Sequence, residues 1–219
     1  MKKDLTELIV LIDESGSMGS VVGDTIGGFN TFLETHQKLP GEAKLTLVKF
    51  DTKYEIVHNG VEVRKVEPLT TKTYKPGGMT ALLDAVGKTI DEVGRRLADT
   101  PENEKPEKVI FMVLTDGEEN SSREYTKEQV KEKTEHQTNN YQWEFIFIGA
   151  DQDAWSNARG IGMSQSYNFT QADMGRTMKG MAYYSSNVRV KSAKASMDNF
   201  DLSDAQLDDE LEKLTKKKS

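Results

Sequence analysis

The sequence predicts an α/β fold on a mostly parallel sheet, because continuous apolar runs of strand length alternate with stretches of helical periodicity. Three such runs occupy residues 8–12, 109–114 and 143–148, the last interrupted only by Glu144. Strands that are apolar throughout are expected where helices cover both faces of a parallel sheet. Ligands bind such sheets beyond the carboxyl ends of the strands, so the loops that follow these runs are the first candidates for a site.

The composition is that of a soluble globular protein, and it restricts the possible partners. The length of 219 residues favours one domain with an appendage. The net charge of −7 argues against nucleic acid and anionic membrane surfaces, since both require a basic footprint. There is no cysteine and the three histidines are scattered. A metal site would therefore be built from oxygen ligands, which favours Mg²⁺, Mn²⁺ or Ca²⁺.

The N-terminal segment does not resemble a targeting sequence. Its apolar run at residues 8–12 is too short for a signal peptide or a membrane span, and an acidic residue follows directly. No later segment approaches the length of a span. We therefore expect a cytoplasmic protein.

The side-chain pattern between the apolar strands predicts a series of helices. They cover residues 21–36, 80–97, 126–138, 153–159 and 170–190. The methionines of the fifth helix, at positions 174, 178 and 181, are more often core residues than an adaptable interaction surface. Ser203 and Gln206 form a capping-box pattern ahead of a last helix that bears Leu207, Leu211 and Leu214.

Shorter strands are predicted at the margins of the sheet. Residues 44–50 and 53–57 alternate apolar and polar side chains, which predicts an antiparallel hairpin at one edge. The Asn59-Gly60 pair is a strong turn signal and predicts a separate short strand over residues 61–66. Residues 165–168 are the last strand candidate.

Oxygen-bearing side chains follow two of the apolar strands and open one helix. Asp13, Ser15 and Ser17 follow the first strand, Thr80 opens a helix after two glycines, and Asp116 follows the strand at residues 109–114. In a parallel sheet these loops meet at one edge, so we expect the five side chains to converge. Asp13, Ser15 and Ser17 are two residues apart, so one tight loop can turn their three oxygens inward. Gly16 permits the backbone conformation that such a loop needs.

The types of these side chains point to a metal that stays reactive. Two carboxylates and three neutral hydroxyls suit a hard cation that prefers oxygen. Because the hydroxyls carry no formal charge, the ion is left poorly neutralised and retains an affinity for one more anionic oxygen. A Glu or Asp side chain of a partner protein would supply that oxygen.

The segments DESGS, PGGMTALLDA and VLTDGEEN resemble the metal-ion-dependent adhesion site of the von Willebrand factor type A domain family, over roughly residues 5–190. The resemblance implies a doubly wound, Rossmann-like sheet of about six strands with helices on both faces. It implies that Ser15, Ser17 and Thr80 bind the metal directly, and that Asp13 and Asp116 bind it directly or through water. It also implies a non-catalytic protein-interaction module. We expect residues 1–190 to form this domain and residues 191–219 to form a connector and an amphipathic helix.

Simpler interpretations exist for single residues of the pattern. Asp13 and Ser17 could cap a helix that begins near residue 18, and Asp116 alone would mark a turn. The joint presence of the Thr and the second Asp favours the metal. We expect Glu118 and Glu119 to be solvated loop charges.

Two further patterns carry weaker hypotheses. Asp151 and Asp153 follow the third apolar strand and could hold a second cation, although helix capping is the commoner role. Asn120 begins a glycosylation-type triplet, which is a chance match in a cytoplasmic protein.

An enzymatic alternative uses the same aspartates. An apolar strand that ends in Asp13 also resembles Mg²⁺-dependent phosphohydrolases of the haloacid dehalogenase type, with Asp13 as the nucleophile. That chemistry usually requires a second Asp two residues later, where this chain has Ser15. Lys75 and Lys88 lack the accompanying context. The sequence therefore favours the interaction module.

Overall fold

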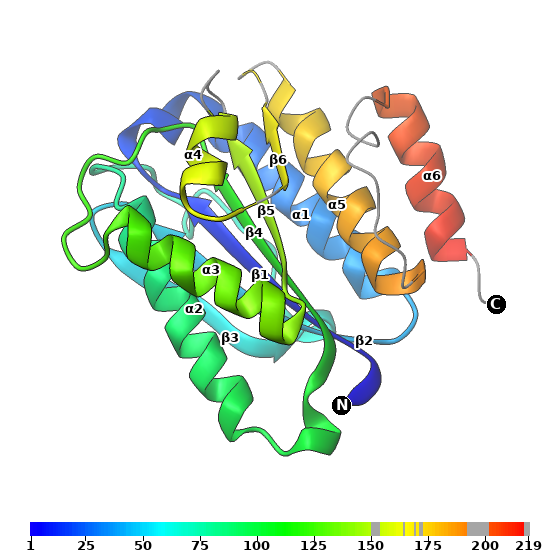
Figure 1. The fold of residues 1–219 in the computed structure, drawn as a ribbon. Helices are drawn as coiled ribbons and strands as arrows, with labels where there is room; N and C mark the ends of the chain where they lie inside the picture. The colour runs from blue at the N-terminus through cyan, green and yellow to red at the C-terminus, as the bar shows by residue number, and fades with distance from the viewer. Residues whose placement is uncertain (150–153, 164, 169, 171–172, 192–201, 217–219) are drawn as a thin grey trace.

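The computed structural model describes residues 1–149, 154–163, 165–168, 170, 173–191 and 202–216. They form one six-stranded sheet in the order β3-β2-β1-β4-β5-β6 (Figure 1). The strands are β1 (Lys2–Asp13), β2 (Glu42–Phe50), β3 (Tyr54–Glu62), β4 (Pro106–Thr115), β5 (Glu144–Gly149) and β6 (Gln165–Asn168). All neighbouring strands pair in parallel except β2 and β3, which confirms a mostly parallel sheet with one antiparallel edge hairpin.

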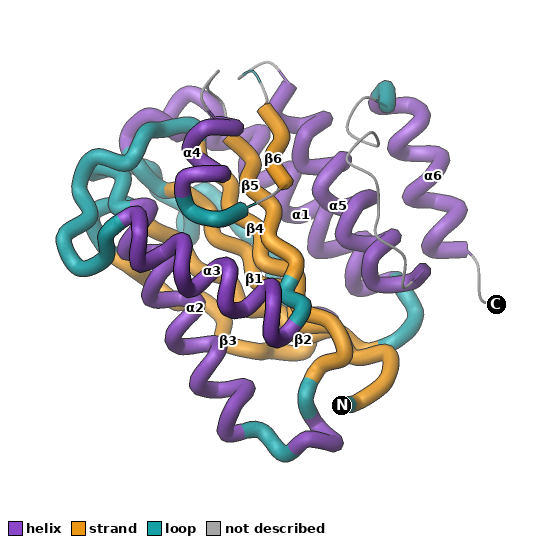
Figure 2. The backbone as a smooth tube through the Cα atoms, viewed as in Figure 1, coloured by secondary structure: helices purple, strands orange, loops and turns teal. Residues whose placement is uncertain are grey.

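Helices cover both faces of this sheet, which lies between them in Figure 2. One layer holds α1 (Val22–Lys38), α5 (Met174–Lys191) and α6 (Asp204–Lys216), and the other holds α2 (Leu82–Asp99), α3 (Lys127–Tyr141) and α4 (Ala154–Gly160). Side chains of β1 alternate between the layers: Leu8, Val10 and Ile12 join the first core, and Ile9 and Leu11 the second. The sheet is therefore covered as the apolar strands predicted.

The strand order places a topological switch point in the middle of the sheet. The chain runs outward from β1 through β2 to β3, and then returns to β4 on the other side of β1. The connections after β1 and β4 therefore lead to helices on opposite faces of the sheet, α1 and α3. In doubly wound sheets ligands bind at such a switch point.

The hairpin departs from the predicted strands at Asn59-Gly60. There is no turn there, because β3 continues through both residues. On β2 only Thr46 lies between Leu45 and Leu47, whereas on β3 two residues, Asn59 and Gly60, lie between their partners Val61 and His58. Gly60 has a φ of +65°, and its N–H donates to Thr46 Oγ1 over 3.0 Å. The left-handed conformation that suits Asn-Gly to a turn also suits it to a β-bulge. The separate strand over residues 61–66 is wrong, because β3 ends at Glu62 and residues 63–65 form a 3₁₀ turn.

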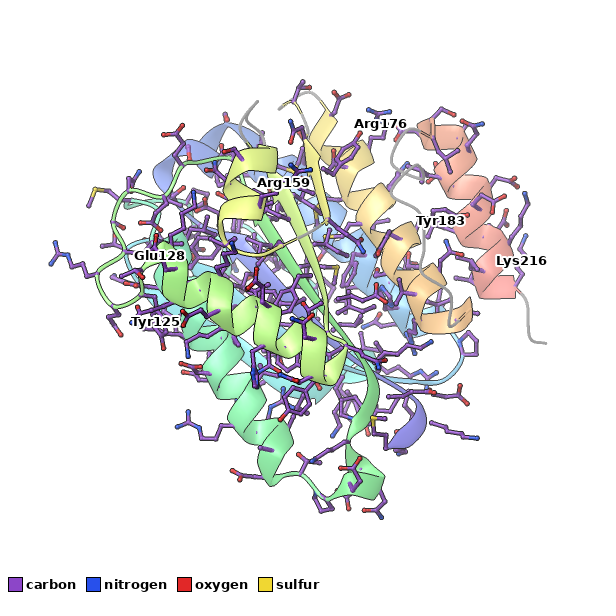
Figure 3. All side chains as sticks on the ribbon, viewed as in Figure 1. Tyr125, Glu128, Arg159, Arg176, Tyr183 and Lys216 are labelled. Carbon is purple, nitrogen blue, oxygen red and sulfur yellow. The ribbon has the colours of Figure 1, made fainter. Side chains whose placement is uncertain are left out.

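The C-terminal helix packs on the layer formed by α1 and α5. Ser203 and Gln206 exchange capping-box hydrogen bonds at its start, as predicted, and its three leucines are buried. Tyr183, labelled on α5 in Figure 3, donates to Glu210 of α6 over 3.2 Å. The three methionines of α5 are fully buried core residues. Among the described residues, no helix is both long and apolar enough to cross a membrane.

Candidate metal centre at the carboxyl edge of the sheet

Three loops meet at the switch point and bring the predicted site residues together. Asp13 is the last residue of β1, Asp116 directly follows β4, and Thr80 lies just ahead of α2. Ser17 Oγ donates to Asp116 Oδ1 over 2.6 Å and lies 3.0 Å from Ser15 Oγ. The loops after β1 and β4 are thus in direct contact through the side chains expected to converge.

Gly117 shows where the remaining oxygens point. A β-carbon placed on it would lie 2.9 Å from Thr80 Oγ1, 3.3 Å from Ser17 Oγ and 3.7 Å from Asp13 Oδ2. Two oxygens from the end of β1 and its loop and one from the segment ahead of α2 therefore face the space beside this glycine, which itself lies in the loop after β4. A side chain at position 117 would fill that space, which the glycine leaves open.

Asp13 is held in a fixed orientation. Its side chain is fully buried, and its two carboxylate oxygens accept from Ser15 N–H over 2.7 Å and from Thr115 Oγ1 over 2.6 Å. The buried Tyr74 hydroxyl donates to its backbone carbonyl over 2.6 Å. Neither the 3₁₀ turn Gly16–Val21 nor α1 has a side-chain cap hydrogen bond. The helix-capping interpretation of Asp13 and Ser17 is therefore wrong.

The two aspartates lack a positive counter-charge. Burial raises the pKa of Asp13, and the neighbouring Asp116 carboxylate raises it further, against hydrogen bonds that lower it. Burial likewise raises the pKa of Asp116. No Lys, Arg or His forms an ion pair with either carboxylate within the described part of the chain. Both groups would be easier to ionise beside a cation.

The chemistry of the donor set suits a hard cation. All five side chains present oxygen, and such cations bind carboxylate and other oxygen ligands. Across the described ranges, no group of three or more His, Cys, Asp or Glu side chains is placed to hold a metal. The centre contains only two carboxylates, so a cation there would need the hydroxyls of Ser15, Ser17 and Thr80 as ligands.

Two residues of the loop after β4 position Thr80. Asn120 Oδ1 accepts from Thr80 N–H over 2.9 Å, and Thr80 O accepts from the N–H groups of Asn120 and Ser121. Asn120 thus has a structural role in the centre. A polar residue near the TDG segment was the only sequence signal for it.

Glu119 anchors the same loop to α2, and the expectation of a solvated charge is wrong for it. Its carboxylate accepts from Leu83 N–H over 2.8 Å and from the N–H groups of Ser121 and Ser122. The first N–H groups of a helix have no partner within the helix, and a nearby carboxylate satisfies them. Glu118 is exposed, as expected.

Glu14 clamps the loop that precedes α2. Its carboxylate accepts from Lys75 N–H over 2.5 Å and pairs with the buried Lys49 over 3.2 Å. Its backbone carbonyl accepts from Gly77 N–H over 2.8 Å, and Gly16 N–H donates to Gly78 O over 3.1 Å. These bonds fix the approach to Thr80. Asp151 and Asp153, the candidates for a second cation, lie outside the described residues.

Comparison with known proteins places the fold among von Willebrand factor type A domains. The chain matches no protein-family model and no curated protein sequence. Among solved structures it is similar to a von Willebrand factor type A protein from Catenulispora acidiphila, with 16% identity and a TM-score of 0.56 over 82% of this chain and 42% of that one. The vWF domain of the type V pili tip protein Mfa5 from Porphyromonas gingivalis matches with 10% identity and a TM-score of 0.58, over 81% of this chain and 93% of that one.

A third neighbour is proximal thread matrix protein 1 from the mussel byssus, whose structure has a zinc-occupied MIDAS motif. It matches with 14% identity and a TM-score of 0.51, over 80% of this chain and 46% of that one. The chain thus spans less than half the length of the Catenulispora and mussel proteins. At these identities the likeness shows the fold alone.

Proposed function

From a fold shared with von Willebrand factor type A domains, we propose that this chain is a non-catalytic protein-interaction module. It holds a divalent cation, Mg²⁺ or in its place Mn²⁺ or Ca²⁺, and captures an acidic side chain of a partner protein there. The ligands are Asp13, Ser15, Ser17, Thr80 and Asp116. The observation that carries the proposal is that oxygens of Asp13, Ser17 and Thr80 face one small space beside Gly117, while Ser17 Oγ also donates to Asp116 over 2.6 Å. The zinc-occupied MIDAS motif of the mussel neighbour supports it.

The hydroxyl ligands explain why a partner is needed. A bound cation supplies a Lewis-acidic position that takes up one further anionic oxygen. Asp13 and Asp116 supply the negative charge, while Ser15, Ser17 and Thr80 add oxygen without charge. A carboxylate from a partner completes the neutralisation, which makes an acidic side chain the fitting ligand.

The surroundings of Asp13 disfavour the phosphohydrolase alternative. Both carboxylate oxygens are engaged, by Ser15 N–H and Thr115 Oγ1, and the side chain is buried. A phosphoryl-transfer site also needs a cationic side chain that balances the charge of the phosphoryl group. Lys88 is paired with Glu124 over 2.7 Å and therefore does not serve Asp13. An assay with an aryl phosphate and Mg²⁺ tests the phosphohydrolase alternative. Turnover that Asp13→Asn abolishes would overturn the proposal of a non-catalytic interaction module.

Thermal unfolding with and without the cation tests the proposed function. We expect Mg²⁺ or Mn²⁺ to raise the Tm of the protein, EDTA to reverse the rise, and Asp13→Ala to remove it. Asp24→Ala is the matched control, because Asp24 is an exposed acid of α1 outside the centre. A cation response that survives Asp13→Ala would refute the centre.

Partner capture tests the second half of the proposal. The tagged protein is incubated with native lysate in Mg²⁺ or in EDTA, and Asp13→Ala is treated in parallel. We expect proteins that are retained only by the wild type and only with the cation. If EDTA lowers the Tm but leaves capture unchanged, the cation has a structural role alone.

We also propose that residues 1–190 form the metal-binding domain and residues 191–219 a connector and helix outside it. The leucines of α6 are buried against the layer of α1 and α5, so α6 contributes stability there. The centre lies at the carboxyl edge of the sheet and takes no residue from α6. Removal of residues 200–219 should lower the Tm yet preserve the rise caused by the cation, and loss of that rise would contradict the division.

A further inference from the structure

A hollow of about 220 Å³ opens beside the candidate metal centre. It lies between the turn that joins β2 to β3, the first turns of α2 and the loop ahead of α3. Half of the residues that line it are charged: Lys53, Asp84, Lys88, Arg123 and Glu124. We will refer to it as the basic hollow, because three of these five side chains are cations.

The basic hollow shares a wall with the centre. Ala81 and Ser121 line it, and Ala81 directly follows Thr80. Ser121 N–H donates to Thr80 O over 3.2 Å, and Ala81 N–H donates to Asp51 O over 3.0 Å. Because neighbouring residues are about 3.8 Å apart along the chain, a ligand at Thr80 lies close to the hollow.

The two anions of the basic hollow are already satisfied by the protein. The Asp84 carboxylate accepts the backbone N–H groups of Arg123, Glu124 and Tyr125, each over 2.9 Å. Burial alone would raise the pKa of Asp84, but these donors and the nearby Lys88 hold it below its usual value. Glu124 is neutralised by Lys88 at 2.7 Å.

Lys88 pairs with Glu124, but the other two cations of the basic hollow have no acidic partner among the described residues. The side chains of Lys53 and Arg123 form no ion pair within the residues that the structure describes. The buried Ser121 Oγ also lacks a hydrogen-bond partner there. Lys53 and Arg123 therefore leave this corner with uncompensated positive charge in a chain whose net charge is −7.

The walls of the basic hollow are anchored. Tyr125, labelled in Figure 3, donates to Asp91 of α2 over 2.8 Å, and Lys133 of α3 lies 5.6 Å from the centre of its ring. On the opposite side, Met79 N–H donates to Thr52 Oγ1 over 3.0 Å. A site with anchored walls loses little conformational entropy when it binds.

We propose that the basic hollow binds a second acidic side chain of the same partner segment whose first acidic side chain reaches the centre. This inference rests on the proposed function. The hollow is smaller than the roughly 300–1,000 Å³ of typical small-molecule sites, so it fits one side chain better than a cofactor. Arg123 can bind a carboxylate through two parallel N–H groups, and Lys53 adds a point charge. The partner is thus a segment with two carboxylates a few residues apart.

Synthetic peptides test this directly. One probe carries a single Glu in a Gly/Ser background, and the others carry a second Glu after about one to four spacer residues, which covers the reach of an extended chain. Affinity is measured with saturating Mn²⁺ and with EDTA. At one spacing we expect the second Glu to raise affinity about fivefold at low salt, with the cation present, as one partly exposed ion pair allows.

Two charge-matched variants assign the gain. Lys53→Ala combined with Arg123→Ala should remove the gain from the second Glu and leave the single-Glu affinity unchanged. The control combines Lys65→Ala with Arg95→Ala, which removes two exposed cations elsewhere and should keep the gain.

The outcomes separate the two proposals. If the single-Glu peptide binds only with the cation but no spacing gives a gain, the second site is wrong and the proposed function stands. If no peptide shows cation-dependent binding, the proposed function fails and this inference with it. If the control variant also loses the gain, the hollow attracts anions only in general and the proposal is overturned. The same holds if the single-Glu peptide gains as much affinity when acetate or inorganic phosphate, at equal concentration, takes the place of the second Glu.

Discussion

Glu7 and Asp13 are both buried acids of β1, yet their surroundings differ. Glu7 lies in the middle of the sheet, where Arg96 of α2 donates to its carboxylate over 2.7 Å and Thr46 of β2 over 2.8 Å. Asp13 lies at the carboxyl edge, where its carboxylate accepts from Ser15 N–H and Thr115 Oγ1. The protein thus neutralises one acid with its own arginine and holds the other with neutral donors alone.

These surroundings determine where an external cation has the greatest effect. A buried carboxylate without a cation costs several kcal/mol, and its partner decides whether that cost is offset. The charge of Glu7 is already neutralised by Arg96, so Glu7 needs no external ligand. Asp13 is placed at the switch point, where doubly wound sheets bind ligands, and is the acid for which a bound cation would change most. Four predictions test this contrast.

The largest effect is expected when Glu7 loses its partner. Arg96→Ala should lower the free energy of unfolding by about 2–4 kcal/mol, because a fully buried carboxylate is left unpaired while the arginine itself was about a quarter exposed. Urea denaturation measures this loss. Arg95→Ala, on the exposed side of the same helix, is the control and should change stability by less than about 0.5 kcal/mol.

A double substitution completes that test. Glu7→Leu combined with Arg96→Leu replaces the pair with apolar side chains and should recover much of the loss, since buried pairs often contribute little net stability. The contrast with Asp13 fails if Arg96→Ala costs no more than Arg95→Ala.

The next effect concerns Asp13 and depends on the cation. In EDTA, Asp13→Asn should change stability by less than about 1 kcal/mol, because it removes a charge that burial disfavours and keeps an oxygen for Ser15 N–H. With free cation at about 100 times the Kd, the wild type should gain about 2.7 kcal/mol and the variant nothing. Glu7→Gln serves as the control and should keep the cation response. An equal gain in wild type and Asp13→Asn would break the contrast.

Much of the fold and the centre could be predicted from the sequence because both depend on local order along the chain. Uniformly apolar strands identify a parallel sheet, and the positions of Asp13, Thr80 and Asp116 relative to these elements place them at one edge. The contrast between the two acids could not be predicted. Glu7 and Arg96 are far apart in the sequence, and their pairing depends on how α2 packs across β1.

Two of the predictions made from the sequence were wrong for the same reason. Asn59-Gly60 allows a left-handed residue, and that conformation serves a bulge as well as a turn; only the pairing with β2 decides between them. Glu119 looks like a solvated charge until the N–H groups at the start of α2 lie beside it. In both cases the deciding contact is made by a different element.

Gly117→Ala should have a smaller effect, confined to the centre. The new methyl group would lie 2.9 Å from Thr80 Oγ1 and 3.3 Å from Ser17 Oγ, so it would occupy the space that these oxygens face. We expect cation affinity to fall about tenfold, or 1.4 kcal/mol, with little change in the Tm in EDTA. Gly19→Ala is the matched control, because its β-carbon would meet nothing within 4 Å. Unchanged affinity in Gly117→Ala would place the cation elsewhere.

The smallest effect extends the contrast to a buried base and appears only below neutral pH. His36 of α1 is fully buried, with Nε2 2.8 Å from Ser185 Oγ of α5, and the Arg189 guanidinium donates to its carbonyl over 2.8 Å. Burial, together with the charge of Arg189, holds the pKa of His36 well below its ordinary value of 6.5. The folded state therefore keeps this ring neutral where the unfolded chain takes up a proton.

The sign of the pH dependence follows from that difference. The stability tied to His36 is fully present above a pH of about 6.5 and is lost as the pH falls toward the folded-state pKa, by up to about 1.4 kcal/mol per pH unit. Urea denaturation between about pH 7 and 6, where the expected loss stays below about 1 kcal/mol, measures the slope, which His36→Gln should flatten. His58→Gln, at a half-buried histidine of β3, should flatten it less. Equal slopes in wild type and His36→Gln would mean that this ring takes up a proton in the folded state despite Arg189, and that burial beside a cation does not keep it neutral.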